Sequence, residues 1–291
     1  MTASDTRLQS LKRQHPEWEP WLAVIEAVLR ETADAKWDAV VPLGAQTQSK
    51  APFLAEAKCE LDRGLIRPFC EQLMRVACGS GTPQMASLKT ALGGKLDVFT
   101  LFRASLNQDG DRIKELAFAL GAERDAFQAV ALLVAVPFLY ACNRRWVRSI
   151  APSWMEGYCP VCGAWPAFAE ARGIERSRHL RCGRCGSEWQ GRGLYCLYCG
   201  MTDHRELVSL VPENSGSNSV IDACTHCRGY LKTFTTLQGS PPDKIILDDL
   251  ASVELDVAAV EQGYKRPQGA GYLLNITVSE NSGLRASLPK T

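Results

Sequence analysis

The segment Cys159-Pro160-Val161-Cys162-Gly163 is the first of four C-x-x-C pairs, and these pairs determine what kind of fold the chain can have. All four pairs lie between residues 159 and 227 and contain eight of the chain's 12 cysteines. A C-x-x-C turn places two sulfurs on one side of a tight knuckle, and two knuckles supply the four thiolates that zinc or a single iron ion prefers. We therefore predict metal sites with eight ligands: Cys159, Cys162, Cys182, Cys185, Cys196, Cys199, Cys224 and Cys227.

The spacing of the pairs favours sequential pairing, first with second and third with fourth. Residues 163–181 separate the first two pairs and residues 200–223 the last two, which is typical of a zinc ribbon or a rubredoxin-like module. Interleaved pairings are the open alternative. Either arrangement predicts two metal ions per chain. Because four protein thiolates leave no coordination position open for water or substrate, hydrolytic metal catalysis is disfavoured and we expect no enzyme activity.

The length and charge of the chain exclude several classes of protein. It has 291 residues, enough for two domains, and its 33 basic and 32 acidic residues give a net charge of +1. That balance provides no long-range attraction to nucleic acid or to an anionic membrane. The longest apolar run, Ala129 to Cys142, is shorter than the roughly 20 residues that span a bilayer, and we find no export signal. We therefore expect a cytoplasmic protein without membrane insertion, whose cysteine pairs hold metal rather than form disulfides.

The part of the chain before the cysteine pairs is predicted to be helical throughout, because apolar residues recur at intervals of three and four. Pro68 is expected in the first turn of one helix, and Gly121 is expected to end another helix that Asp109 or Asp111 caps. The segment from about residue 123 to residue 147 is apolar on most faces and is expected to be the central helix. The other cysteines lie in this part and are expected to pack as small apolar side chains: Cys59, Cys70, Cys78 and Cys142.

The cysteine-rich part has too few aliphatic residues to fold on apolar burial alone, so metal is expected to hold it together. After it, an amphipathic helix is expected to present one apolar face made of Leu250, Val253, Val257 and Val260. The predicted fold is α+β and has these parts: a helical domain over 1–152, two rubredoxin-like or zinc-ribbon modules over about 153–194 and 195–240, a C-terminal helix within 241–267, and a loosely ordered tail over 268–291.

The motifs around the cysteines resemble those of a known family. They include Cys159-Pro160-Val161-Cys162-Gly163, Cys182-x-x-Cys185-x-x-Glu188-Trp189, Cys196-x-x-Cys199, Cys224-x-x-Cys227-x-x-Tyr230-Leu231-Lys232 and Glu261-Gln262-Gly263-Tyr264. From Tyr158 to Pro267 the sequence resembles the formate dehydrogenase accessory protein family FdhE. The resemblance implies a cytoplasmic, non-catalytic protein that is needed for formation of active formate dehydrogenase. It also implies rubredoxin-like sites, with iron favoured over zinc, and the catalytic subunit of the enzyme as partner.

Two other classes of protein compete with this interpretation. A nucleic-acid-binding zinc-ribbon protein is suggested by Arg176, Arg178, Arg181 and Arg184, which lie close together in the sequence. Such a protein needs a basic face, and the near-neutral charge argues against it. Arginines near the cysteines are instead expected to offset the negative charge of the thiolates. A rubredoxin-like electron carrier is the other alternative, but it would have no use for some 150 helical residues, which are better explained as a docking platform.

Overall fold

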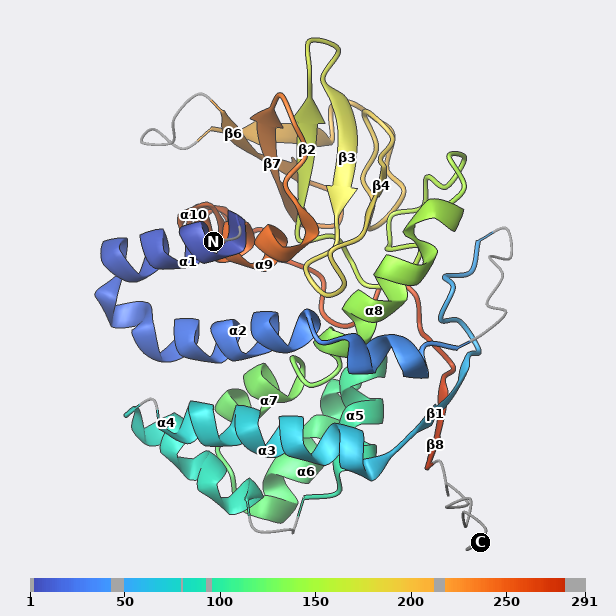
Figure 1. The fold of residues 1–291 in the computed structure, drawn as a ribbon. Coiled ribbons are helices and arrows are strands. Elements are labelled where there is room, and N and C mark those ends of the chain that lie inside the picture. Colours follow the sequence, from blue (N-terminus) through green and yellow to red (C-terminus); the bar gives the residue numbers. More distant parts are fainter. Residues whose placement is uncertain (1–2, 43–49, 80, 93–95, 212–217, 281–291) are drawn as a thin grey trace, which may run out of the picture.

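The computed structural model describes residues 3–42, 50–79, 81–92, 96–211 and 218–280. Its helices are stacked in several tiers and a six-stranded sheet lies above them, so the predicted α+β fold is confirmed (Figure 1). The helices of the first half are α1 Ala3–Gln14, α2 Glu19–Thr32, α3 Arg63–Cys78, α4 Pro83–Ala86, α5 Val98–Asn107, α6 Gly110–Leu120, α7 Arg124–Ala131 and α8 Val136–Trp146. Short 3-10 turns join them at Pro16–Trp18, Ala35–Val40, Ser87–Ala91 and Val147–Ser149.

The predicted central helix is present in two pieces, α7 and α8. Pro137 has no N–H to donate to the carbonyl of Leu133, so the helix cannot continue unbroken through this position. Residues 136–143 of α8 are buried on every side. The helical stretch Arg124–Ser149 is long and apolar enough to cross a membrane, but 72% of its most apolar window is buried inside the protein, as in a core helix.

Capping residues explain where two other helices begin. The side chain of Asp109 accepts a hydrogen bond from the N–H of Arg112 and starts α6, and Gly121 ends it with a φ of 66°, as predicted. The prediction for Pro68 is wrong, because α3 starts five residues earlier and Pro68 lies inside it. Asp62 accepts a hydrogen bond from the N–H of Gly64 at 2.7 Å and fixes this earlier start.

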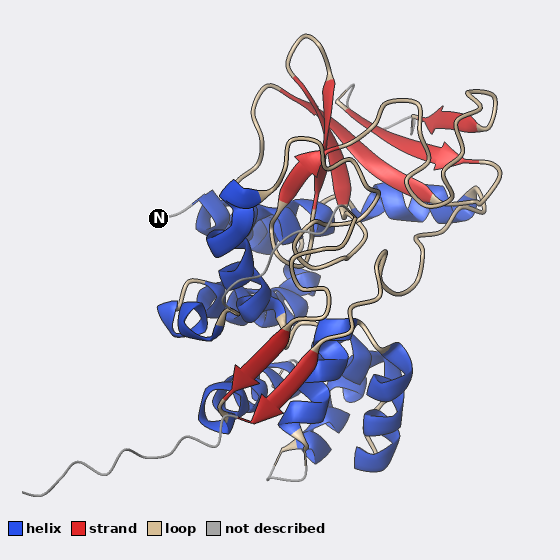
Figure 2. Ribbon diagram, turned by 90° about the vertical axis from the view of Figure 1, so that its right-hand side faces the viewer, coloured by secondary structure: helices blue, strands red, loops and turns tan. Residues whose placement is uncertain are grey.

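The strands of the large sheet run in the order β4-β3-β2-β7-β6-β5. The first three come from the segment of the first two cysteine pairs: β2 Phe168–Arg172, β3 Ser177–Arg181 and β4 Glu188–Gln190. The other three come from the segment of the last two pairs: β5 Leu207–Leu210, β6 Ser219–Cys224 and β7 Tyr230–Thr236. Because β2 pairs in parallel with β7, the two modules are halves of one continuous sheet (Figure 2).

The sequence predicted helices throughout the first part of the chain. That prediction is wrong at one place, because this part also contains strand β1, Lys58–Leu61. This strand pairs in parallel with β8, Thr277–Glu280, from the segment that was predicted to be a loose tail. Leu274 and Ile276 are buried just before β8 and anchor the segment to the helical core. Residues 281–291 of the predicted tail lie outside the described residues.

The predicted C-terminal helix consists of α9 Ile245–Leu250 and α10 Val253–Glu261, preceded by a 3-10 turn at Pro242–Lys244. The predicted apolar face is wrong, since Val257 and Val260 are 52% and 60% exposed. Leu255 and Ala259 are buried against the sheet instead. The hydroxyl of Ser252 donates to the carbonyls of Asp248 and Asp249 where α9 ends, and the resulting break changes the face that α10 turns inward.

Candidate metal centres

The first tetrad consists of Cys159, Cys162, Cys182 and Cys185, whose sulfurs all lie within 4.8 Å of one another. The Sγ atoms of Cys159 and Cys185 are 3.5 Å apart, as are those of Cys162 and Cys182. Metal–sulfur bonds of about 2.3 Å in a tetrahedron give sulfur–sulfur edges of about 3.8 Å. A disulfide would need about 2.05 Å, so the spacing of the four sulfurs suits a shared ion and not a disulfide.

The second tetrad consists of Cys196, Cys199, Cys224 and Cys227, and its sulfurs also lie within 4.8 Å of one another. The Sγ atoms of Cys196 and Cys227 are 3.7 Å apart, and those of Cys199 and Cys224 are 3.8 Å apart. These distances match the edge of a tetrathiolate tetrahedron. The structure thus brings the first pair together with the second and the third with the fourth, and each set of donors fits one metal ion.

Backbone hydrogen bonds shape the knuckles that carry the sulfurs. In three of them the N–H of the glycine that follows the pair donates to the carbonyl of the first cysteine at 2.9–3.0 Å: Gly163, Gly186 and Gly200. Each of these glycines has a φ between 68° and 78°, which a side chain rarely adopts. Arg228 stands at the equivalent position of the fourth knuckle with a φ of 59°. Its guanidinium donates to the carbonyls of Gln262 and Gly263 and so ties this knuckle to the end of α10.

The charge chemistry of the first tetrad also points to a cation. Burial and the neighbouring sulfurs raise the pKa of Cys159 and of Cys185 well above the usual value. Burial acts in the same direction on Cys182, but hydrogen bonds from the surrounding cysteines outweigh it and lower the pKa of this thiol. Four thiolates can therefore coexist in this buried space only when a bound cation offsets their charge. All four first-tetrad cysteines have exposed fractions of 0%.

The four other cysteines lie outside the tetrads. Cys59, Cys70 and Cys142 are buried and Cys78 is half-buried, which agrees with packing as small apolar side chains. Burial raises the pKa of Cys59 and of Cys70 to about 12, so both thiols remain protonated at neutral pH. Cys59 lies on β1, not on a helix as its surroundings in the sequence suggested.

The first tetrad is enclosed by three separate parts of the chain. The N–H groups of Phe53 and Leu54 donate to the carbonyls of Pro160 and Val161 in the first knuckle, at 2.8 and 3.2 Å. In the second knuckle, the Arg184 guanidinium donates to the carbonyls at the end of α5, those of Ser105 and Leu106, at 2.7 and 3.3 Å. The carbonyl of Gly163 accepts from the N–H of Tyr272 in the C-terminal segment at 2.9 Å. The first tetrad thus lies where the helices, the sheet and the C-terminal segment meet.

The arginines near the cysteines have partners other than the thiolates. Arg181 is buried and pairs with Glu170 and Glu188 at 3.0 and 3.2 Å, and Arg178 reaches Asp222 at 3.4 Å. These two side chains thus pair with carboxylates, whereas Arg184 and Arg228 donate to carbonyls and keep their full charge, so the offset of thiolate charge by nearby arginines stays a prediction. Nearby histidines also lie outside both tetrads: His179, His204 and His226.

Sequence reasoning missed a buried ion network that ties α9 and α10 to the sheet. Lys232 of β7 is completely buried, and its Nζ lies 2.7 Å from Asp249 Oδ1 and 2.9 Å from Asp256 Oδ2. Arg266 contacts the same two carboxylates at 2.7 and 2.8 Å. The one available signal was a lysine in the middle of a strand, Leu231-Lys232-Thr233, where a free charge would be costly.

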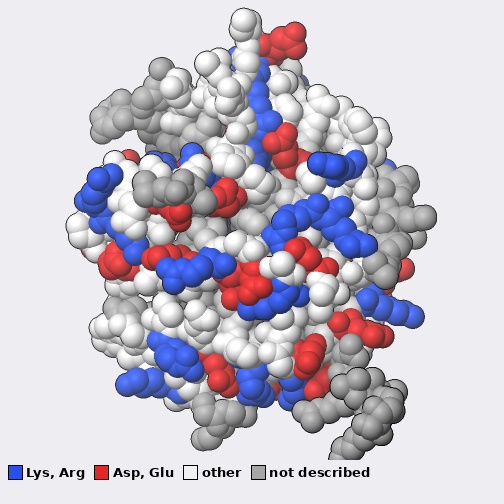
Figure 3. Space-filling view, in the orientation of Figure 1, with Lys and Arg blue, Asp and Glu red and all other residues white. Residues whose placement is uncertain are grey.

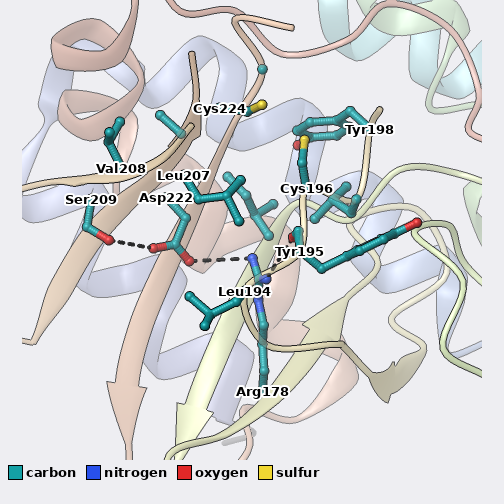
Figure 4. Close-up of a pocket in the computed structure, with 14 residues that line it drawn as sticks. Arg178, Leu194, Tyr195, Cys196, Tyr198, Leu207, Val208, Ser209, Asp222 and Cys224 are labelled. Atoms are coloured by element: carbon teal, nitrogen blue, oxygen red, sulfur yellow. Dashed lines mark hydrogen bonds and ion pairs between the residues drawn. The ribbon is translucent and has the colours of Figure 1, made fainter. Parts of the chain in front are cut away.

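A pocket of about 140 Å³ lies beside the second tetrad (Figure 4). Arg178 and Asp222 face each other inside it, and Ser209 donates to Asp222 at 3.2 Å. Cys196 and Cys224 form part of its wall. Its other lining residues are apolar or aromatic, among them Leu194, Leu197, Tyr195, Tyr198, Leu207 and Leu231.

Comparisons with known proteins point to one family. Residues 194–274 match the family model described as FdhE, C-terminal domain. The chain is 27% identical over 199 residues to an FdhE homologue of Aquifex aeolicus, covering 66% of this chain and 64% of that one. It is 33% identical over 181 residues to an FdhE homologue of Pseudomonas aeruginosa, covering 54% of this chain and 58% of that one. The matches thus cover less than two thirds of either relative.

A solved structure extends the comparison to the fold. The crystal structure of the FdhE protein from P. aeruginosa superposes with a TM-score of 0.53 and covers 94% of both chains. The sequence identity in that superposition is 19%, so the likeness concerns the fold alone.

Proposed function

We propose, from the premise that this chain resembles the FdhE family in sequence and in fold, that it is a metal-binding accessory factor in the formation of active formate dehydrogenase. The observation that carries the proposal is the pair of cysteine tetrads, each with sulfur–sulfur contacts of 3.5–3.8 Å. We infer that the eight cysteines are metal ligands and that each tetrad holds one ion. Iron is the favoured metal and zinc the alternative.

The residues around the tetrads support a role without catalysis. Four thiolates occupy all the coordination positions of a tetrahedral ion, so neither site offers a position at which water or substrate would be activated. A bound iron would supply one-electron redox chemistry, whereas zinc would supply only structure. The knuckles hold the sulfurs through backbone N–H groups, since Val161, Arg184 and Gly229 each have an N–H within 3.4 Å of a ligand sulfur. We propose that the protein acts by docking on the catalytic subunit of formate dehydrogenase in the cytoplasm.

The charge distribution gives the nucleic-acid-binding alternative no support. Figure 3 shows basic and acidic side chains interspersed on the face that it draws, with no continuous basic surface. Arg178, Arg181 and Arg184 are occupied by partners within the protein, and the exposed Arg176 donates to the hydroxyl of Thr235 at 3.3 Å. We therefore infer that the accessory role explains the described surface better than nucleic-acid binding does.

Metal analysis of the full chain, purified without air and combined with a visible absorption spectrum, tests the proposal first. We expect two ions per chain, with thiolate-to-iron bands if the metal is iron. Cys182→Ser should lose one ion and part of the folded sheet, because a structural tetrathiolate ion contributes about 10–16 kcal/mol. Cys78→Ser, in a cysteine outside both tetrads, is the matched control and should keep both ions.

Docking is tested by capture of the formate dehydrogenase catalytic subunit on the immobilised protein, and by formate dehydrogenase activity in cells that lack the chain. We expect capture by the metal-loaded protein and recovery of activity with the wild-type chain but not with Cys182→Ser. A protein that binds two ions, yet neither captures the subunit nor restores the activity, would refute the accessory role.

A further inference from the structure

The two tetrads have the same ligands and nearly the same spacing, but their surroundings differ. All four cysteines of the first tetrad are buried. In the second tetrad Cys199 is exposed and Cys227 is half-buried, while Cys196 and Cys224 remain buried. The ligand thiols are thus fully buried in the first tetrad, whereas in the second tetrad some of them are exposed to solvent.

The first tetrad cannot open without separating large parts of the molecule. Its two knuckles are hydrogen-bonded to the 53–54 segment, to the end of α5 and to Tyr272. Packing is equally tight, since a Cβ added at Gly186 would lie 2.7 Å from the Cβ of Pro242. A Cβ added at Gly163 would lie 2.8 Å from the carbonyl oxygen of Tyr272. A ligand can therefore reach this ion only after the helices, the sheet and the C-terminal segment have moved apart.

The third knuckle, Cys196–Gly200, is open on its outer side. Among the residues that the structure describes, a Cβ added at Gly200 would meet only the hydroxyl of Tyr195, at an ordinary 3.6 Å. Cys199 and Gly200 are both exposed. On another side, the 140 Å³ pocket reaches Cys196 and Cys224 (Figure 4). A small molecule can therefore come close to the second tetrad without any rearrangement of the fold.

From this contrast we propose that the second tetrad is an exchange site, at which an external thiolate takes the place of Cys199 and the ion can leave. The first tetrad keeps its ion as a permanent part of the fold. The inference rests on the proposed function, because both tetrads must bind metal. Thiolates are the incoming class because a soft ligand competes best for an ion held by four sulfurs.

The exchange step conserves charge and electrons. The sulfur of an incoming thiolate would bind the ion as the bond from Cys199 breaks, and Cys199 would leave as a thiolate that takes up a proton from water. Further external thiolates would then replace the other three ligands, Cys196, Cys224 and Cys227, in the same way, so that the ion leaves bound to external thiolates. Nothing is oxidised or reduced. Cys199 is the ligand that leaves first, because it alone of the eight tetrad cysteines is exposed.

Zinc release from the full-length, zinc-loaded chain tests the proposal. The protein is mixed with the zinc indicator 4-(2-pyridylazo)resorcinol and increasing amounts of 2-mercaptoethanol, and the remaining zinc is then counted after denaturation. We expect one of the two ions to leave at least about 100-fold faster than the other, because the buried site must open before it exchanges. The fast rate should rise with the thiol concentration, and the slow rate should not.

Two further measurements assign the fast phase to a site. Cys199→Ser should lose the fast phase and keep the slow one, whereas the control Cys78→Ser should keep both. In the wild-type chain, iodoacetamide added after the fast phase should label Cys196, Cys199, Cys224 and Cys227 but none of the first-tetrad cysteines, which identifies the emptied site without any variant.

The outcomes separate the inference from the function on which it rests. If the loaded protein holds two ions that leave at one rate, or if labelling shows that the first tetrad empties first, the exchange proposal is wrong and the metal-binding proposal stands. If the fast rate is independent of the thiol, the thiolate exchange step is wrong. A loaded protein with fewer than two ions would contradict the proposed function itself.

Discussion

Replacing Lys232 with methionine tests whether the buried ion network holds α9 and α10 against the sheet. The Lys232 ammonium has three close acceptors: the carbonyl of Asp249 at 2.8 Å, its carboxylate at 2.7 Å and the carboxylate of Asp256 at 2.9 Å. Arg266 contacts both carboxylates, and Tyr230 donates to Asp256 at 2.7 Å. Two cations and two anions therefore balance, and the substitution leaves one negative charge without compensation.

The expected loss follows from that imbalance. Removing one partner of a buried ion pair costs about 3–5 kcal/mol, because the remaining charge stays buried without its partner. Arg266 still contacts both aspartates after the substitution, so we expect the lower end, about 3 kcal/mol. Lys232→Met with Asp256→Asn restores neutrality, and its loss should be smaller than the sum of the single losses by about 1–3 kcal/mol.

Denaturant unfolding of the metal-loaded chain, followed by circular dichroism, measures these differences. Lys244→Met is the matched control, since Lys244 lies 3.6 Å from Asp248 in a partly exposed pair and its loss should change the free energy of unfolding by less than about 1 kcal/mol. A Lys232→Met protein as stable as this control, or strictly additive losses in the double variant, would show that the network does not hold α9 and α10 in place.

Three other predictions concern the sheet and the knuckles. Glu170 is buried, which raises the pKa of its carboxyl, but the N–H of Ser240 and the guanidinium groups of Arg181 and Arg172 outweigh burial and hold this pKa below its usual value. Its contribution to stability is therefore present above the unfolded pKa of about 4.3 and is lost as the pH falls below that value. The melting temperature between pH 3 and pH 7 should consequently depend less on pH in Glu170→Gln than in the wild-type chain. Equal slopes of melting temperature against pH would contradict this. Gly186→Ala should destabilise the chain far more than Gly173→Ala, because both positions have a φ near 70° but only the new Cβ at Gly186 meets Pro242; similar melting temperatures would refute the packing argument. Arg228→Gly should relieve the left-handed backbone of the fourth knuckle but release the end of α10, so hydrogen exchange should rise near Gln262 and Gly263 while both ions stay bound; unchanged exchange there would show that the guanidinium does not hold the helix end.

The local parts of the structure were predictable from the sequence because their causes lie within a few residues. Each C-x-x-C knuckle is built from five consecutive residues, and the glycines at positions 163, 186 and 200 indicate the left-handed backbone that it needs. The cap at Asp109 and the stop at Gly121 are local in the same sense. The pairing of the knuckles within each tetrad could also be favoured from spacing alone.

The long-range parts were not predictable, because nothing local encodes them. Strand β1 pairs with β8, which lies more than 200 residues later in the chain. Neither segment contains a sequence pattern that identifies the other as its pairing partner. The parallel pairing of β2 with β7 joins the two modules through residues about 60 positions apart. The inward face of α10 depends on the break at Ser252, so the apolar pattern over 250–260 misled a prediction that assumed one continuous helix.

The difference in exposure between the two tetrads is another long-range feature that the sequence could not predict. It is the one that bears most on function. Both sets of ligands come from C-x-x-C pairs, so the sequence motif assigns them the same chemistry. Their accessibility depends on what packs against the knuckles, and the packing partners of the first tetrad are the 53–54 segment, the end of α5 and Tyr272, all distant in sequence. A ligand motif therefore predicts that an ion is held, whereas the ease of its release depends on the surrounding fold. The helical domain and the C-terminal segment together enclose the first tetrad, whereas Cys199 of the second remains exposed to solvent.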